Sequence, residues 1–351
     1  MPTDTENPGR TRARRRATKG ATISSVARLA GVSPMTVSNV INNKSSVQQA
    51  KRDAVLKAIA ELDYRPNAAA RALASASTLR IGLLHRDEES ALLSAMLVGA
   101  LRATSRMGVQ LILQTYSPET EIEDVLAFAR ADIDGLLLPP PLCERFGMSG
   151  RSAELSIPLA AMAPGKALAD MVCVRIDDEE ATCALTSSLI ARGHRDIAFV
   201  QLPDTEVGKA RLAGYRRALH KHGIPYRSSL IWSARPYFSE GLKLAEAKLT
   251  PGLKASAIMA GNDDTAAAFI NVALRRGLRV PEDISITGFD DTPIAIKIWP
   301  PLTTVRQPLA EIAEQATNLL IARLRNPGAD RALPHFVDFA LIERGSVLAR
   351  K

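Results

Sequence analysis

Apolar positions between residues 22 and 62 recur with the spacing of short amphipathic helices. In the segment TISSVARLAG, apolar residues return every three or four positions, Thr22 is a suitable N-cap, and Gly31 can take the left-handed conformation that ends a helix. Ser33 is expected to cap a second helix that begins at Pro34, where the missing N–H costs nothing. A third helix is expected at about Gln48–Leu62. The pattern therefore predicts a three-helix unit.

From residue 79 onward, short β-branched or leucine-rich runs alternate with helical stretches such as Ser94–Met107 and Ala181–Arg192. This alternation predicts an α/β domain, with a parallel sheet covered by helices on both faces. More than 200 residues of it indicate two such sheets, with a ligand cleft at the carboxyl ends of the strands. The expected strands are LRIGLL (79–84), VQLILQT (109–115), DGLLLP (134–139), IPLAAMA (157–163), DIAFVQL (196–202), SAIMAG (256–261) and ISITGFD (284–290).

The segment NAAARALAS, Asn67 to Ser75, joins these two patterns. It is good helix material and Asn67 can cap it, but about nine residues are too few for a stable isolated helix in water. Two interpretations stay open from these residues. The segment is a helix that folds only in context, or it is a flexible alanine-rich linker.

The net charge of +8 is concentrated at one end of the chain. Residues 1–80 hold 14 Lys and Arg against 5 Asp and Glu, a net of +9, and the remaining residues carry −1. A basic block beside a neutral body is typical of a phosphate-backbone binder, although a solvated tail explains Arg10–Lys19 equally well. Two short helices joined by a turn with Gly31 match a helix-turn-helix, whose second helix reads the major groove. Together these features predict double-stranded DNA as a partner.

Several classes of protein are not expected from the composition. The apolar runs are four to eight residues long, well short of the roughly eighteen that a membrane span needs. The first twenty residues are basic with no apolar stretch behind them, so no secretory signal is expected and the predicted location is cytoplasmic. Cys143, Cys173 and Cys183 form no CxxC pair and are expected to be buried thiols without a metal or catalytic role.

Two motifs resemble signatures of the LacI/GalR family of bacterial repressors. GVSPMTVSNVIN (31–42) resembles the family's GVSxxTVSxxLN pattern, and LDYRPNAAARALA (62–74) resembles its hinge. The resemblance extends over nearly all of the chain after residue 21, and it implies a small all-α helix-turn-helix headpiece followed by a two-lobed periplasmic-binding-protein-like domain with parallel sheets. The implied regions are a disordered basic tail (1–20), the headpiece (21–66), a hinge helix and linker (67–78), and an effector-binding and dimerisation domain (79–351), with an N-lobe at about 79–176 and 307–336 and a C-lobe at about 177–306 and 337–345.

The resemblance assigns the DNA contacts residue by residue. It implies that two hinge helices pair in the minor groove and insert Leu73 between base steps, with Arg71 near the phosphates and Asn67 as the cap. The implied contacts of the headpiece are base reading by Pro34, Met35 and Asn39, and backbone binding by Ser33, Thr36, Ser38 and Asn42, beside the helix cap Thr22. Many relatives carry arginine, which prefers guanine, where this chain has Asn39, and asparagine can pair with adenine. The half-site is therefore expected to differ at that base pair.

Five effector-binding residues follow from the resemblance in the larger domain. KARLAGYRRAL (209–219) supplies Arg211, MAGNDD supplies Asn262 and Asp263, GFDD supplies Asp290, and LTTVRQP supplies Gln307. One guanidinium, two carboxylates and two amides can bracket hydroxyl groups or a carboxylate. Alternatives stay open for the acids, because Asp263 could only cap the helix that follows it, and a capping role is favoured for Asp177.

Two departures from the family bear on the effector. Many sugar-binding relatives carry an aspartate where this chain has Ala163, and an aromatic pair where it has Leu92 and Leu93. The loss of negative charge beside Arg211 slightly favours an acidic effector such as a sugar acid.

The expected function is a ligand-responsive, sequence-specific DNA-binding regulator. The family implies a repressor of a carbohydrate or sugar-acid utilisation operon, released from a palindromic operator by a small-molecule effector. Since each headpiece reads one half-site, a homodimer is expected, and the end Ala349-Arg350-Lys351 has no leucine heptad for a tetramer.

An enzyme and a periplasmic-type solute carrier are the alternatives. GxSxG, a P-loop, HExxH and GxGxxG are missing from the sequence. The acid pair Asp290-Asp291 could serve acid–base chemistry, and His220 and His222 lie at the polar end of a helix, where solvation is favoured over a metal. The expectation is a protein that is not an enzyme, with no catalytic residues, cofactor or metal.

Overall fold

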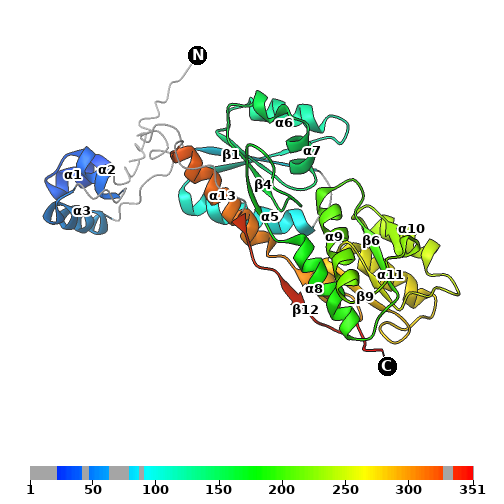
Figure 1. Cartoon of the computed structure of the whole chain (residues 1–351). Coiled ribbons are helices and arrows are strands. Elements are labelled where there is room, and N and C mark those ends of the chain that lie inside the picture. Colours follow the sequence, from blue (N-terminus) through cyan, green and yellow to red (C-terminus); the bar gives the residue numbers. More distant parts are fainter. Residues whose placement is uncertain (1–21, 42–46, 63–78, 87–90, 327–334, 351) are drawn as a thin grey trace, which may run out of the picture. The chain divides into compact units, whose positions relative to one another are not determined.

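The computed structural model describes residues 22–41, 47–62, 79–86, 91–326 and 335–350. The chain divides into two compact units, residues 1–78 and 79–351 (Figure 1). Within the described ranges, no helix has the length and apolar character that crossing a membrane requires.

Capping residues set the ends of the helices in the first unit. Thr22 caps the first helix and forms a capping box with Ser25, and Gly31 ends that helix in the left-handed region at φ 65°. The Ser33 hydroxyl accepts a hydrogen bond of 3.2 Å from Thr36 N and so caps the second helix, which begins with a proline as expected. The described helices of this unit are α1 (Ile23–Ala30), α2 (Pro34–Ile41) and α3 (Gln49–Glu61).

Apolar side chains from the three helices form one small core. Helices this short are marginal in isolation, so their stability comes mainly from this packing. The side chain of Ile41, the last residue of α2, lies outside the described residues. The buried members of the core are Val26, Ala27, Val37, Val40, Val55 and Ala58.

The N-lobe of the second unit is built on a six-stranded parallel sheet with the order β11-β5-β4-β3-β1-β2. Successive side chains of β3 alternate between two cores: Leu137 packs with α5 and α13, and Leu136 packs with α6 and α7 on the other face. The strands are β1 (Arg80–His85), β2 (Gln110–Thr115), β3 (Gly135–Leu138), β4 (Leu159–Met162), β5 (Met171–Arg175) and β11 (His335–Phe336). The helices are α5 (Ala91–Met107), α6 (Glu121–Ala129), α7 (Leu142–Met148), η1 (Arg151–Glu154) and α13 (Leu309–Arg325).

The C-lobe repeats this arrangement with the order β12-β10-β9-β8-β6-β7, in which only β12 is antiparallel to its neighbour. Phe199 of β6 packs toward α8 and α9, whereas Val200 packs toward α10 and α11. The strands are β6 (Ile197–Gln201), β7 (Ile231–Ser233), β8 (Ala257–Met259), β9 (Ser285–Asp290), β10 (Thr303–Arg306) and β12 (Ala340–Ile342). The helices are α8 (Asp178–Ala191), α9 (Glu206–Lys221), η2 (Ser228–Leu230), α10 (Phe238–Lys248), α11 (Asp263–Arg275) and α12 (Ile294–Lys297).

The chain passes between the two lobes three times. It leaves the N-lobe between β5 and α8, returns between β10 and α13, and leaves again between β11 and β12 (Figure 1). Gln307 lies on the second of these crossovers. The predicted fold class, an all-α helix-turn-helix unit followed by two parallel-sheet lobes, is confirmed.

All seven predicted strands are present, with ends that differ by a few residues from the expected ones. The two predicted helices begin three residues earlier than expected, at Ala91 and Asp178. The sequence pattern missed β5, β7, β10, β11 and β12. Three of these strands have only two or three residues, too few for a recognisable period, and they exist because the neighbouring strand pairs with them.

Candidate DNA-binding and effector-binding sites

The second helix of the headpiece divides its residues between the core and solvent. Val37 and Val40 are buried, whereas Pro34 and Met35 are exposed, Met35 by 69%. Ser38 and Asn39 are half-buried, as is Thr36. The predicted base-reading residues therefore include two exposed side chains on the first turn of α2.

The hydroxyl groups near the helix ends already take part in capping. Thr22 Oγ1 accepts from Ser25 N at 3.2 Å, and Ser33 Oγ lies 2.9 Å from Thr36 Oγ1. Such caps orient backbone N–H groups, which suit phosphate contacts at a helix N-terminus. The other predicted DNA-binding residues, Asn42, Asn67, Arg71 and Leu73, lie outside the described residues.

Arg211 lies at the centre of a buried polar cluster in the C-lobe. It is only 4% exposed, and its guanidinium stacks on the Phe289 ring with 3.5 Å between Cζ and the ring centroid. Nε donates to Asp178 Oδ1 at 2.9 Å, Nη1 donates to Gly261 O at 2.5 Å, and Nη2 lies 3.6 Å from Asp290 Oδ1. The guanidinium is thus held in one orientation by groups on α8, β9 and the loop after β8.

Asp290 joins this cluster to the crossover between the lobes. Gln307 Nε2 donates to Asp290 Oδ1 at 2.5 Å, and both side chains are buried. Its neighbour Asp291 faces elsewhere, since its two oxygens pair with Arg306 and Arg344 at 2.6 and 2.7 Å. The two acids are therefore separated, and neither is arranged as half of an acid–base pair. Three predicted effector residues, Arg211, Asp290 and Gln307, come together.

The predicted residues Asn262 and Asp263 have structural partners. Asn262 caps α11 by accepting from Thr265 N, so the alternative that Asp263 provides this cap is wrong. Asp263 Oδ2 accepts from the amide and hydroxyl of Thr292, and Oδ1 accepts from the Thr304 hydroxyl at 2.7 Å. Asp263 is 1% exposed, and its hydrogen bonds with Thr292 hold the chain after β9 against the start of α11. The expected cap Asp177 is confirmed, because it accepts from Glu180 N at the start of α8.

Burial dominates the electrostatics of these acids. It raises the pKa of Asp178, and the Arg211 guanidinium opposes that rise. Burial also raises the pKa of Asp263, and repulsion by the carboxylate of Asp290 adds to the effect. For Asp290, burial raises the pKa while Arg211 and the hydrogen bond from Gln307 lower it. Arg211 thus favours the charged forms of the two acids that face it.

One negative charge beside Arg211 was not expected from the sequence. Ala163 supplies none, but Asp178 pairs with the guanidinium in addition to the predicted Asp290. Asp178 was not predicted as a site residue, because it stands 33 positions before Arg211 and no local spacing links the two. Asp178 lies in the first turn of α8, the helix that packs against α9, and this position is the one feature of the sequence that indicates it.

Strained backbone marks the carboxyl ends of two strands. Ala163, directly after β4, has φ 50°, and Asp290 and Asp291, at the end of β9, have φ 107° and 56°. Non-glycine residues in this region cost energy and cluster at functional sites. Both places lie at the edges of the sheets where a ligand cleft was expected.

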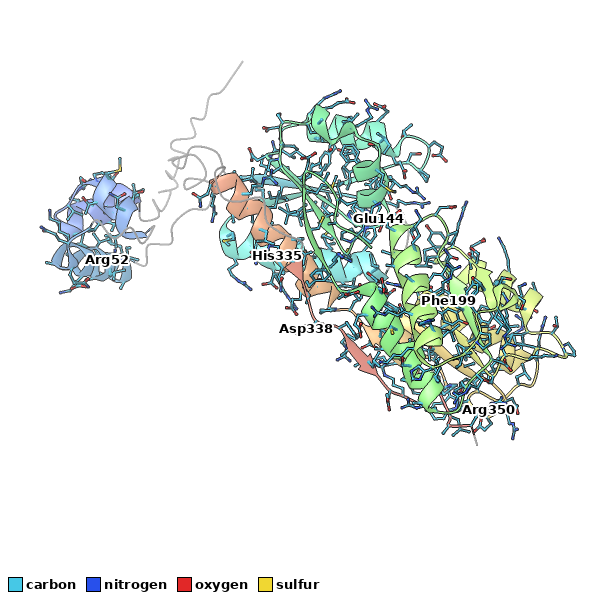
Figure 2. The ribbon with its side chains drawn as sticks, in the orientation of Figure 1. Arg52, Glu144, Phe199, His335, Asp338 and Arg350 are labelled. Atoms are coloured by element: carbon cyan, nitrogen blue, oxygen red, sulfur yellow. The ribbon has the colours of Figure 1, made fainter. Side chains whose placement is uncertain are left out.

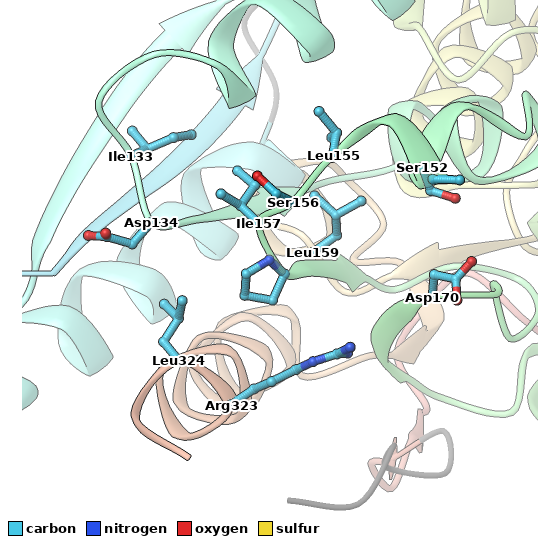
Figure 3. Close-up of a pocket in the computed structure, with 12 residues that line it drawn as sticks. Ile133, Asp134, Ser152, Leu155, Ser156, Ile157, Leu159, Asp170, Arg323 and Leu324 are labelled. Carbon is cyan, nitrogen blue, oxygen red and sulfur yellow. The ribbon is translucent and has the colours of Figure 1, made fainter. Parts of the chain in front are cut away.

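A separate cavity of about 650 Å³ opens at the opposite, amino-terminal ends of the N-lobe strands (Figure 3). Asp134 precedes β3, Asp170 precedes β5, and Arg323 reaches in from α13. None of the five predicted effector residues lines this cavity. Within the part of the chain that the structure describes, no cluster of three or more His, Cys, Asp or Glu residues could hold a metal ion. The three cysteines are buried, as expected.

A helix-turn-helix unit followed by a two-lobed α/β domain with a buried polar cluster beside its crossovers defines a class of protein, the ligand-responsive DNA-binding regulators. Comparison with family models gives the same two parts. Residues 22–67 match the bacterial regulatory proteins of the lacI family, and residues 186–347 match the periplasmic binding protein-like domain.

Known proteins resemble the chain over nearly its whole length. Catabolite control protein A of Priestia megaterium is 32% identical over 333 residues, which cover 91% of this chain and 98% of that protein. The transcriptional repressor PurR of Klebsiella pneumoniae is 33% identical, over 93% of this chain and 97% of its own. The solved structure of the lac repressor dimer bound to operator and the anti-inducer ONPF has a TM-score of 0.70 and 25% identity, covering 94% of this chain and 100% of its own.

The chain belongs to the LacI family of bacterial regulatory proteins. It is therefore a DNA-binding transcription regulator that responds to an effector, and not an enzyme. Its family places it in the cytoplasm.

Proposed function

We propose that this regulator represses a carbohydrate or sugar-acid utilisation operon, and that an effector bound beside Arg211 and Asp290 releases it from a palindromic operator. The observation that carries the proposal is the Arg211 cluster, in which a buried guanidinium is fixed on Phe289 between Asp178 and Asp290. Donors and acceptors held in this way suit the recognition of hydroxyl groups.

The charge of the cluster favours a neutral sugar over a sugar acid. Arg211 is already compensated by Asp178 and Asp290, so a ligand carboxylate would meet two negative charges close to the guanidinium. A structurally similar regulator, CelR, has been solved as a cellobiose complex, with a TM-score of 0.67 and 28% identity over 93% of this chain and 99% of its own.

In the headpiece, we assign base reading to Pro34, Met35 and Asn39, and backbone binding to Ser33, Thr36, Ser38 and Asn42 beside the cap Thr22. The exposed first turn of α2 supports this assignment. A palindromic site requires two headpieces, so the proposed assembly is a homodimer, and the hinge residues Asn67, Arg71 and Leu73 belong to the same DNA contact. In the effector site, Arg211, Asp290 and Gln307 contact the ligand. Asn262 and Asp263 shape the loops around it.

Isothermal titration of the full chain tests the proposal. The titrants are a panel of neutral sugars and sugar acids, with and without an operator duplex selected from randomised palindromes. We expect a neutral sugar to bind and to lower operator affinity, with the operator lowering sugar affinity by the same factor. Sugar binding that leaves operator affinity unchanged, or binding of sugar acids alone, would contradict the proposal.

A matched pair of arginine variants locates the site. Arg211→Lys keeps the charge but loses the planar fork that holds Asp178 and Gly261 O, so effector binding is expected to weaken by about tenfold or more. Arg323→Lys, at the cavity in Figure 3, is the control and should leave effector affinity unchanged. The opposite pattern would move the effector site to that cavity.

A further inference from the structure

A buried carboxylate of the N-lobe is bonded to a helix of the C-lobe. Glu144 lies on α7, is 1% exposed, and is labelled in Figure 2 beside the start of α9. Glu144 Oε2 accepts from Glu206 N at 2.7 Å, and Oε1 accepts from Val207 N at 3.2 Å. Its third donor, Gly165 N at 2.7 Å, belongs to the N-lobe loop after β4. Two of the three donors are therefore in the other lobe.

These bonds complete the N-terminus of α9. The first amides of a helix have no partner inside the helix, and they attract negative charge. Thr205, the N-cap, accepts from Gly208 N, and Glu144 takes the amides of Glu206 and Val207. A single side chain thus satisfies the two α9 amides that the cap of the helix leaves open.

The backbones of the two lobes also touch at this point. A Cβ built on Gly165 would lie 2.1 Å from Val207 N, so only glycine permits this approach. Lys166, the next residue, pairs with Glu206 at 3.1 Å. Farther along the facing edges, Arg86 Nη1 donates to Tyr237 Oη at 3.0 Å. The lobes are closed on each other here, and Glu144 is the buried member of these contacts.

Helix α9 carries this contact into the effector site. Arg211 stands five residues after Glu206 on the same helix, which is roughly 7.5 Å along its axis. Because a helix moves as a rigid element, any shift of its N-terminus away from Glu144 also shifts the guanidinium relative to the N-lobe. A residue that served only to stabilise its own lobe would find its donors there.

We propose that Glu144 is an inter-lobe latch, a positioning residue that holds the N-terminus of α9 against the N-lobe and thereby sets where Arg211 stands in the closed cleft. The latch goes beyond the proposed effector class, because it concerns the balance between closed and open lobes whatever the ligand is.

Hydrogen exchange of the full chain, without ligand or DNA, tests the latch with two variants that weaken the contact between the lobes in different ways. Glu144→Gln removes the charge and leaves one acceptor oxygen for three N–H donors. Gly165→Ala leaves Glu144 in place but adds a methyl group. This methyl group would clash with the backbone of Val207 when the lobes are closed, and it has room when they are open. Glu123→Gln, an exposed acid of α6 paired with Arg151, is the control.

Both variants should speed exchange of the Glu206 and Val207 amides by about tenfold or more, while amides within the N-lobe sheet exchange as in the parent protein and in Glu123→Gln. Both should also change effector affinity in the same direction. The latch is refuted if those two amides stay protected in either variant, or if Glu144→Gln speeds exchange across the whole N-lobe. If the amides respond but no sugar binds, the latch stands and the proposed effector class fails.

Discussion

At the scale of single residues, Arg211 shows how a charge can be kept inside a protein. Taking a guanidinium out of water is costly, and the cost is offset only by good geometry and by partners for its N–H groups. Asp178, Asp290, Gly261 O and the Phe289 ring supply both. Contacts within the protein thus fix the geometry of the cluster, and such preorganisation favours selective binding.

Removing one of the two acids that pair with Arg211 should lower the stability of the protein. Asp178→Asn leaves Arg211 buried with half of its compensation, and we expect a loss of about 3–5 kcal/mol in the free energy of unfolding. Urea unfolding followed by circular dichroism measures it. Glu180→Gln, on the same helix but half-exposed in a pair with Arg217, should cost at most about 1 kcal/mol. Equal losses in the two variants would contradict the account.

His194 should make stability depend on pH. Burial lowers its pKa, and the positive charges of Arg350 and Arg192 add to this effect, whereas the hydrogen bond between Nε2 and Leu348 O, at 3.0 Å, opposes it. The unfolded chain takes up a proton near pH 6.5, so the contribution of this histidine is full above that pH and declines below it. His194→Gln should flatten the slope of unfolding free energy between about pH 7.5 and 5.5.

Asn39 should determine which base is preferred at one position of each operator half-site. Its half-buried amide can pair bidentately with adenine, whereas arginine prefers guanine O6 and N7. Asn39→Arg is expected to change the preferred base at one position of each half-site, by roughly 1–3 kcal/mol of discrimination. Binding selection on randomised half-sites measures this, and an unchanged sequence preference would remove Asn39 from the base-reading residues.

At the scale of secondary structure elements, the stability of a short helix is sensitive to the capping of its ends. Helix α1 has eight residues, so the amides at its N-terminus, which lack partners inside the helix, are a large share of its backbone N–H groups. Thr22→Ala removes the oxygen that accepts from Ser25 N and should destabilise α1 by about 1 kcal/mol. Faster hydrogen exchange of the α1 amides in the full chain would report it. Ser24→Ala, at an exposed position inside the same helix, should not speed exchange, because alanine is the better helix former.

The strands differ in how far the local sequence determines them. β3 is buried on both faces, and its continuous run GLLL made it recognisable from the sequence. β10 and β12 are antiparallel neighbours at the edge of the C-lobe sheet, close to crossovers that return from the N-lobe. Their position depends on how the lobes are connected, and local residue preferences do not encode it.

At the scale of the whole molecule, large exposed apolar side chains indicate where a second copy could bind. Between β9 and β10, Trp299 is 79% exposed and Ile296 is 65% exposed. Aromatic residues are enriched at the centres of protein interfaces. Trp299→Glu is therefore expected to weaken the proposed homodimer by at least about 2 kcal/mol, measured by sedimentation of the full chain. Met148→Glu, an exposed apolar position on α7, is the control, and dissociation by both variants to the same extent would exclude a specific role for Trp299.

The sequence by itself determined the three helices of the headpiece, seven of the strands and the order of the two units. Helical periodicity, the caps Thr22 and Ser33, and the turn at Gly31 specify the headpiece locally, since each depends on residues at most four positions apart. The alternation of strands and helices likewise specified an α/β domain, and motif resemblance indicated Arg211, Asp290 and Gln307.

Only the tertiary structure decided which charges meet. Asp178 pairs with Arg211 across 33 positions, Thr304 binds Asp263 across 41, and Glu144 caps α9 across 62. No period or motif links such residues, because their distance in space is set by sheet order and by the three crossovers between the lobes. For the same reason the Asp178 carboxylate beside Arg211 was not expected from the sequence. Local patterns select the elements, and packing of distant segments in a low-dielectric interior selects the partners of each buried charge.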